Sequence, residues 1–142
     1  MPEPNAKPGT YALVLAASKR QRISVGKLRT FEVRPGFYVY VGSALGPGGL
    51  AARIGRHARQ EKTLRWHVDY LRAVTDLVEV WFRPGRQRRE CSWAERLAGM
   101  PGAGTPMPGF GASDCGCRSH LFYFEERPMP TIAGIEVWRS AS

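Results

Sequence analysis

Four polar side chains suited to phosphate chemistry occur in a fixed order in the first half of the chain. The sequence reads Gly9-Thr10-Tyr11, then Tyr40-Val41-Gly42-Ser43-Ala44, then Arg53-x-x-x-His57. Because Arg53 and His57 are four residues apart, they project from the same side of a helix. Hydrolysis of a phosphodiester needs a cation near the phosphate, a group that deprotonates water and a positive group that stabilises developing charge. The pattern therefore predicts a nuclease-like site between strand ends and a helix.

Hydrophobic patterning indicates the elements that position these groups. Residues 10–17 are almost continuously apolar and predict a central strand covered on both faces. The aromatic and β-branched run 37–41 predicts a strand that pairs antiparallel with the first. A Gly-rich turn at 46–49 precedes a helix expected from Leu50 to about Gln60. The sequence also predicts extended segments over 22–25 and 29–33, a helix over 64–74, a strand over 77–82, a helix over 87–97, and strands over 120–124 and 132–138.

Size and charge narrow the class of protein. A chain of 142 residues can bury enough surface for one self-sufficient core. We expect an α/β fold in which a small, mostly antiparallel sheet of three or more strands is flanked by helices. Residues 1–8 should form a flexible lead-in, 9–126 the domain, and 127–142 a C-terminal extension with a possible further strand. Lys and Arg exceed Asp and Glu by 21 − 12 = 9, a surplus that attracts polyanions. DNA is the expected partner, with RNA as an open alternative.

Cysteine content and hydropathy indicate the compartment. The cysteines, Cys91, Cys115 and Cys117, form no even-numbered framework, and this favours a reducing, cytoplasmic environment. No stretch approaches about 18 uninterrupted apolar residues, so neither secretion nor membrane spanning is expected.

Taken in this order, the residues resemble the GIY-YIG nuclease superfamily, in a stand-alone branch similar to Uri-type endonucleases. The resemblance runs from Gly9 to about Phe124. It implies two tyrosines that position or activate the attacking water, a helix arginine that contacts the phosphate, and a glutamate that holds one divalent ion, Mg²⁺ or Mn²⁺. These roles would fall on Tyr11 and Tyr40, on Arg53 with His57 beside it, and on Glu90. We expect these five side chains to converge on one concave surface.

The metal-binding glutamate has an alternative on the same predicted helix. Glu90 precedes the apolar Trp93 and Ala94 by three and four residues, which is the pattern the family shows, whereas Glu95 faces another direction. We therefore prefer Glu90. The chain departs from better-known members of the family in its Gly-Thr-Tyr motif, in its long hairpin connection and in residues 113–120, where many relatives carry an asparagine-containing segment.

Basic residues beside these motifs are candidates for contacts to the DNA backbone. Such contacts give affinity without sequence information. An ordinary solvated turn is the alternative for the arginines around Pro84-Gly85 and for Lys19, Arg20 and Arg22. The candidate nucleic-acid-binding residues are Ser43, Arg56, Arg86, Arg88 and Arg89.

A second group of residues has the side-chain types of a zinc site. Cys115, Cys117 and His120, with Cys91, could ligate zinc, but Cys-x-Cys is tighter than the usual Cys-x-x-Cys spacing. We therefore do not expect zinc and favour small buried cysteines. His67 and Asp69 form a further polar pair that could reach the cleft behind the other groups.

These observations predict a divalent-metal-dependent endonuclease that hydrolyses DNA in a structure-directed way or with low sequence specificity. No base-reading module such as a helix-turn-helix pair is recognisable in the sequence. The alternatives are a nucleic-acid-binding protein of the same fold with little hydrolytic activity, and a zinc-stabilised interaction module.

Overall fold

The fold is an antiparallel sheet with helices on both faces. The computed structural model describes residues 5–25, 29–59, 67–107, 110 and 119–139. Within these residues a five-stranded sheet has the order β6-β4-β1-β5-β7, and every neighbouring pair is antiparallel. The predicted pairing of the first strand with the aromatic strand is confirmed. The strands are β1 (Gly9–Ala17), β4 (Gly36–Ala44), β5 (Asp76–Pro84), β6 (Leu121–Phe124) and β7 (Glu136–Arg139).

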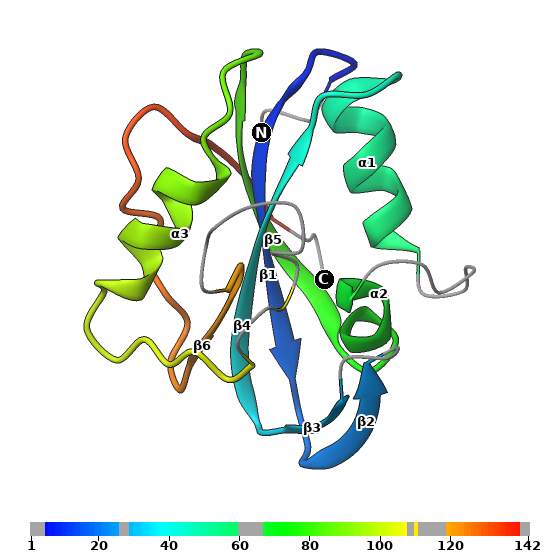
Figure 1. Cartoon of the computed structure of the whole chain (residues 1–142), viewed down its shortest axis with the longest axis vertical. Coiled ribbons are helices and arrows are strands. Elements are labelled where there is room, and N and C mark those ends of the chain that lie inside the picture. Colours follow the sequence, from blue (N-terminus) through cyan, green and yellow to red (C-terminus); the bar gives the residue numbers. More distant parts are fainter. Residues whose placement is uncertain (1–4, 26–28, 60–66, 108–109, 111–118, 140–142) are drawn as a thin grey trace.

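The helices divide between the two faces of the sheet (Figure 1). Helix α1 (Gly49–Ala58) and helix α2 (His67–Arg72) share a core with Leu13 and Leu15 of β1. Helix α3 (Glu90–Ala98) packs against the opposite face, in a core that includes Ala12 and Val14. Since successive side chains of a strand point to opposite faces, the apolar run of β1 supplies both cores. No described helix is long and apolar enough to cross a membrane.

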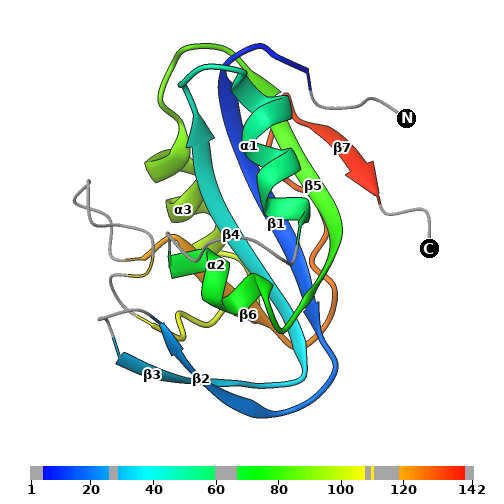
Figure 2. The same cartoon turned by 90° about the vertical axis from the view of Figure 1, so that its right-hand side faces the viewer.

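A separate two-stranded ribbon lies at the far end of β1. It consists of β2 (Gln21–Val25) and β3 (Arg29–Val33), and Figure 2 shows it below α2. Arg20 forms an ion pair with Glu32 across this ribbon. Ala17 lies six residue steps along β1 from Tyr11, about 20 Å of strand. The basic turn at Lys19 and Arg20 therefore does not lie beside the tyrosines.

Several element ends differ from the sequence-based prediction. Helix α3 begins at Glu90 and not at residue 87, because Gly85 (φ +138°) turns the chain and the first helical hydrogen bond runs from Trp93 N to Arg89 O (2.9 Å). Helix α2 ends at Arg72, where the Thr75 hydroxyl donates to the Leu71 carbonyl (3.0 Å). The last two strands begin at Leu121 and Glu136, later than expected.

Residues 5–8, which belong to the predicted lead-in, form backbone hydrogen bonds with the start of α1 and with Gly85. Leu50 N donates to Lys7 O (2.9 Å), and Ala51 N donates to Asn5 O (2.6 Å). Gly85 N donates to Pro8 O (2.8 Å). Free amides at a helix start need acceptors, and the backbone carbonyls of Asn5 and Lys7 supply them for α1. Residues 1–4 lie outside the described part of the chain.

Candidate active site

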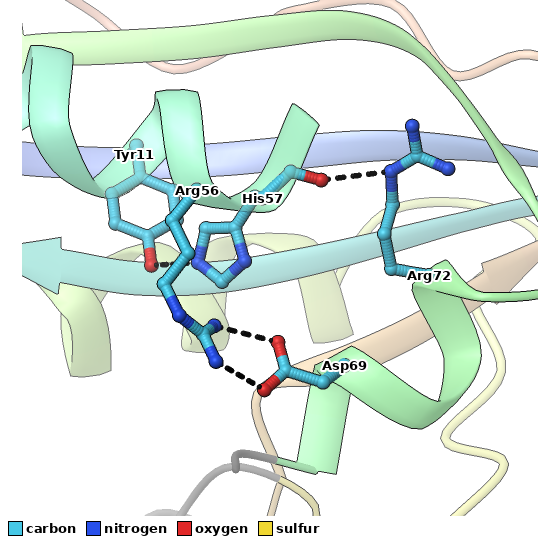
Figure 3. Close-up of polar contacts among 5 residues, drawn as sticks. All are labelled: Tyr11, Arg56, His57, Asp69 and Arg72. Atoms are coloured by element: carbon cyan, nitrogen blue, oxygen red, sulfur yellow. Dashed lines mark hydrogen bonds and ion pairs between the residues drawn. The ribbon is translucent and has the colours of Figure 1, made fainter. Parts of the chain in front are cut away.

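Tyr11, Tyr40 and His57 meet on the α1 side of the sheet. The Tyr11 hydroxyl lies 2.7 Å from His57 Nε2, a hydrogen bond drawn in Figure 3. The Tyr40 ring centroid lies 6.1 Å from that of His57. All three side chains are buried, with 1% of Tyr11, 9% of Tyr40 and none of His57 exposed. Tyr40 is thus the tyrosine nearer to solvent.

Burial controls the protonation of both tyrosines. Burial raises the pKa of Tyr11 far above its usual range, and the neighbouring Tyr40 adds to this effect, while Arg53 opposes it. Burial also raises the pKa of Tyr40, to about 12, against the opposing effect of Arg53. At neutral pH both side chains are therefore phenols. We assign Tyr11 O–H as the donor to His57 Nε2 in the pair.

Arg53 joins this cluster from the middle of α1. Its Nη1 donates to the backbone carbonyl of Ser43 (3.1 Å), at the end of β4. Together with Arg56 it lines a cavity of about 190 Å³ beside the turn that precedes α1. The predicted cluster of Tyr11, Tyr40, Arg53 and His57 is therefore brought together, with a small basic cavity next to it.

Arg56, a candidate for DNA contact, is engaged within the protein. Its guanidinium donates from Nη1 and Nη2 to the two carboxylate oxygens of Asp69 (2.8 and 2.9 Å). The Asp69 side chain is fully buried on α2, and only 18% of the Arg56 side chain is exposed. The sequence had indicated Asp69 only as a polar residue that could reach the cleft.

Arg72 is a residue of this region that the sequence did not reveal. Its Nε donates to the His57 carbonyl (2.9 Å) and its Nη2 to the Ala58 carbonyl (3.0 Å), which closes the end of α1. An arginine at the end of a predicted helix carries no signal that identifies such acceptors in advance.

Glu90 starts α3 on the other face of the sheet. It lies on the same helix stripe as Trp93, Ala94 and Leu97, which face the core, whereas Glu95 is exposed. Only 12% of the Glu90 side chain is exposed, and its Oε1 lies 3.8 Å from Arg88 Nη1. Its Oε2 is buried with no hydrogen-bond partner among the described residues. The structure does not join Glu90 to the tyrosine cluster by a hydrogen bond within the described chain.

His120 connects Glu90 to strand β4. Burial lowers the pKa of His120, and the charge of Glu90 opposes this shift. The His120 carbonyl accepts a hydrogen bond from Val41 N of β4 (2.9 Å). The charge of Glu90 therefore acts on His120, and His120 is bonded to Val41, the residue that follows Tyr40 on β4. In the described ranges, no group of three or more metal-ligating side chains occurs.

The arginines before α3 differ in exposure. Arg86 and Arg88 are exposed, and Arg89 is half-buried with its Nη2 donating to Gln87 Oε1 (3.1 Å). Ser43 is half-buried at the end of β4. Arg86 and Arg88 are therefore the more accessible of these candidates for phosphate contacts.

The candidate zinc ligands are only partly described. Cys91 is disulfide-bonded, so in this state its sulfur is not a free thiolate ligand. This also differs from the reduced cysteines that the sequence suggested. Cys115 and Cys117 lie outside the described residues. His67 stands apart from these, with its ring 5.5 Å from that of Phe110 on the α1 side of the sheet.

Comparison with known proteins identifies the family. A family model described as domain of unknown function DUF123 matches residues 10–141, nearly the whole chain, and the chain belongs to this family. No curated protein and no solved structure matches the chain.

Proposed function

We propose that this DUF123 protein is a divalent-metal-dependent endonuclease of the GIY-YIG type that hydrolyses phosphodiester bonds in DNA. The observation that supports this most is the convergence of Tyr11, Tyr40, Arg53 and His57 around the 2.7 Å hydrogen bond between Tyr11 and His57 Nε2. A phenol that holds its proton beside an imidazole nitrogen can pass that proton on as it receives another. Arg53 supplies positive charge next to the same phenol.

The proposed roles follow from the positions of these groups. A proton lost by an attacking water would pass to the Tyr11 hydroxyl oxygen as the proton already on that oxygen moves to His57 Nε2. Arg53 would bind the phosphate whose charge increases during attack. The scissile phosphate would lie near the C-terminal end of β4, where Arg53 donates to the Ser43 carbonyl and the His120 carbonyl accepts from Val41 N.

Glu90 suits a divalent ion better than Asp69 does. Asp69 is fully engaged by Arg56, whereas Glu90 has a buried oxygen with no hydrogen-bond partner in the described part of the chain. Mg²⁺ is commonly bound by one or two carboxylates, with water and substrate phosphate as further ligands. A bound ion would supply positive charge to the phosphate oxygens.

The substrate class follows from charge. A net charge of +9 favours a polyanion, and Arg86 and Arg88 are exposed at the turn before α3. Phosphate contacts of this kind position a duplex without reading its sequence. We therefore propose DNA cleavage that depends on structure or has low sequence specificity.

The test is incubation of purified protein with branched, nicked, single-stranded and duplex DNA in Mg²⁺, in Mn²⁺ or in EDTA. We expect cleavage of at least one substrate with either metal and none in EDTA. The Glu90→Gln variant serves as the inactive control, and Glu95→Gln on the exposed side of α3 as its matched partner. Equal products from wild type and Glu90→Gln would contradict the proposal, since they would indicate a contaminating nuclease.

A second candidate is a DNA-binding protein with little hydrolytic activity. It is favoured by the placement of Glu90, whose helix packs on the opposite face of the sheet from Arg53. It is also favoured by the burial of Tyr11, which is 1% exposed. DNA binding that survives in every condition without any metal-dependent cleavage would support this candidate.

A further inference from the structure

A buried ion pair connects α2 to the helix that carries the cluster. Arg56 and Asp69 share two hydrogen bonds, of 2.8 and 2.9 Å, in the side-by-side arrangement shown in Figure 3. The Asp69 side chain is completely covered, and the Arg56 side chain retains 18% exposure. A bidentate pair of this kind fixes the plane of the guanidinium as well as its position.

Helix α2 also bonds to His57, the residue that follows Arg56 on α1. Arg72 donates to the carbonyl groups of His57 and Ala58. Asp69 and Arg72 are three residues apart on α2, so they project from the same side of that helix. Helix α2 therefore bonds to α1 at Arg56 and at the carbonyl groups of His57 and Ala58. These contacts flank the His57 ring, which bonds to Tyr11.

Arg56 lies beside a small cavity that a second arginine also lines. Arg53 and Arg56 line the cavity of about 190 Å³ at the start of α1. Both Nη atoms of Arg56 bond to the Asp69 carboxylate. Arginine recognises phosphate through its planar set of donors, and this recognition depends on the orientation that Asp69 sets.

We propose that Asp69 is a positioning residue that acts through Arg56, holding its guanidinium at the wall of this cavity so that Arg53 and Arg56 together bind one phosphate of the DNA backbone. This inference rests on the proposed function, because it specifies how the same site takes its substrate. Asp69 itself contacts no phosphate. Its charge also acts on the neighbouring phenols, raising the pKa of Tyr11 and of Tyr40 as a minor contribution beside burial.

A role confined to folding is not what the chemistry of the pair suggests. Burying two charges costs several kcal/mol, and apolar residues of similar volume often stabilise a protein at least as well. The pair is placed beside a cavity lined by a second arginine, and not in the apolar core around Leu13 and Leu15. Orientation of Arg56 is a benefit that apolar side chains could not supply.

The test compares Asp69→Asn with Asp76→Asn, which removes the same charge from an exposed position at the start of β5. We expect Asp69→Asn to lower kcat by roughly tenfold or more, the scale of a lost positioning contact. The Kd for a short duplex should rise by only a few fold, because the lost orientation of Arg56 weakens one phosphate contact while a negative charge near the phosphates is removed. Asp76→Asn should change neither. A fall in melting temperature with parallel losses of kcat and binding would indicate a merely structural role and overturn the proposal.

Two further variants keep the test decisive. In a double-mutant cycle, Asp69→Asn combined with Arg56→Gln should cleave no more slowly than Arg56→Gln alone, because Asp69 acts only through Arg56. Multiplying losses would contradict this. Asp69→Glu, which retains the carboxylate, should recover part of the kcat lost in Asp69→Asn. No recovery, with the melting temperature restored, would also contradict the proposal.

A spectroscopic readout separates this inference from the proposed function. In NMR spectra with EDTA present, the guanidinium signals of Arg56 should shift when a short DNA duplex is added to wild type, and should not shift in Asp69→Asn. If wild type cleaves no DNA but shows these shifts, the nuclease function fails while the role of Asp69 in phosphate binding stands. If wild type shows no shift, the role of Asp69 fails whatever the cleavage assay gives.

Discussion

Gly42 lies directly opposite Tyr11 in the β1–β4 register, and the Tyr11 hydroxyl occupies the space that a side chain at Gly42 would need. A Cβ atom at this position would be 2.5 Å from Tyr11 Oη and 2.6 Å from its Cζ. Such distances are far below van der Waals contact. The glycine of the second motif therefore allows the tyrosine of the first to reach His57.

The first prediction follows from this relationship. Gly42→Ala should displace the Tyr11 ring, break its bond to His57, and destabilise the protein by about 1–3 kcal/mol, as overpacking usually does. Cleavage should fall by more than the loss of stability explains, at temperatures where the variant is folded.

Gly55→Ala is the matched control, because Gly55 lies within α1 and a Cβ atom there would meet no other atom within 4 Å. It should stabilise the helix by about 0.5–1 kcal/mol. Urea denaturation and single-turnover cleavage measure both effects.

The second prediction concerns the Tyr11 hydroxyl alone. Tyr11→Phe keeps the ring and removes the bond to His57 Nε2, so cleavage should fall by about 10²–10⁴, the range of general acid–base contributions. Unfolding should become easier by only about 1–2 kcal/mol, the cost of a lost buried hydrogen bond. Tyr38→Phe is the control, since Tyr38 is buried on the same strand as Tyr40 and its hydroxyl accepts a hydrogen bond from Arg34 N (2.9 Å). Equal rate losses in the two variants would refute a specific role for Tyr11.

The third prediction addresses Glu90. Glu90→Gln should abolish cleavage and leave the affinity for DNA equal or higher, because the proposed metal ligand and one negative charge are lost. The same change should lower the pKa of His120 further, since the carboxylate now opposes the lowering caused by burial. NMR titration of His120 checks this independently of activity. Retained cleavage at saturating metal would show that Glu90 has no role in the mechanism. An unchanged pKa of His120 would show that the Glu90 carboxylate does not act on that ring.

The sequence predicted the strands and their pairing better than the polar contacts between helices. The continuous apolar run around Leu13 identified a strand buried on both faces, and the aromatic run around Val39 identified its antiparallel neighbour. Once this hairpin and α1 are in place, the spacing of Arg53 and His57 brings them towards the tyrosines. Local patterns were sufficient because each of these residues is fixed by its own element.

Contacts that depend on how elements pack were not predictable in the same way. The bond between Arg56 and Asp69 requires the position of α2 against α1, which no local pattern encodes. The hydrogen bonds from α1 to Asn5 and Lys7 use backbone carbonyls, which every residue carries. The spacing of Glu90 to Trp93 favoured it over Glu95, but neither its burial nor the face of the sheet on which α3 packs was predicted.

The last prediction is a dependence of stability on alkaline pH. Burial raises the pKa of Tyr40 from 10.0 to about 12 in the folded protein. Below about pH 10 the phenol is protonated in both the folded and the unfolded state, and its contribution to stability is complete. Between about pH 10 and 12 the unfolded state binds fewer protons than the folded state, so stability falls as pH rises. The slope should reach about 1.4 kcal/mol per pH unit for each such tyrosine.

Urea denaturation across this pH range should show a shallower fall of the unfolding free energy for Tyr40→Phe and for Tyr11→Phe than for wild type. Parallel curves for all three proteins would mean that neither phenol is buried as the structure has it, and the site would then have to be open to water before DNA binds.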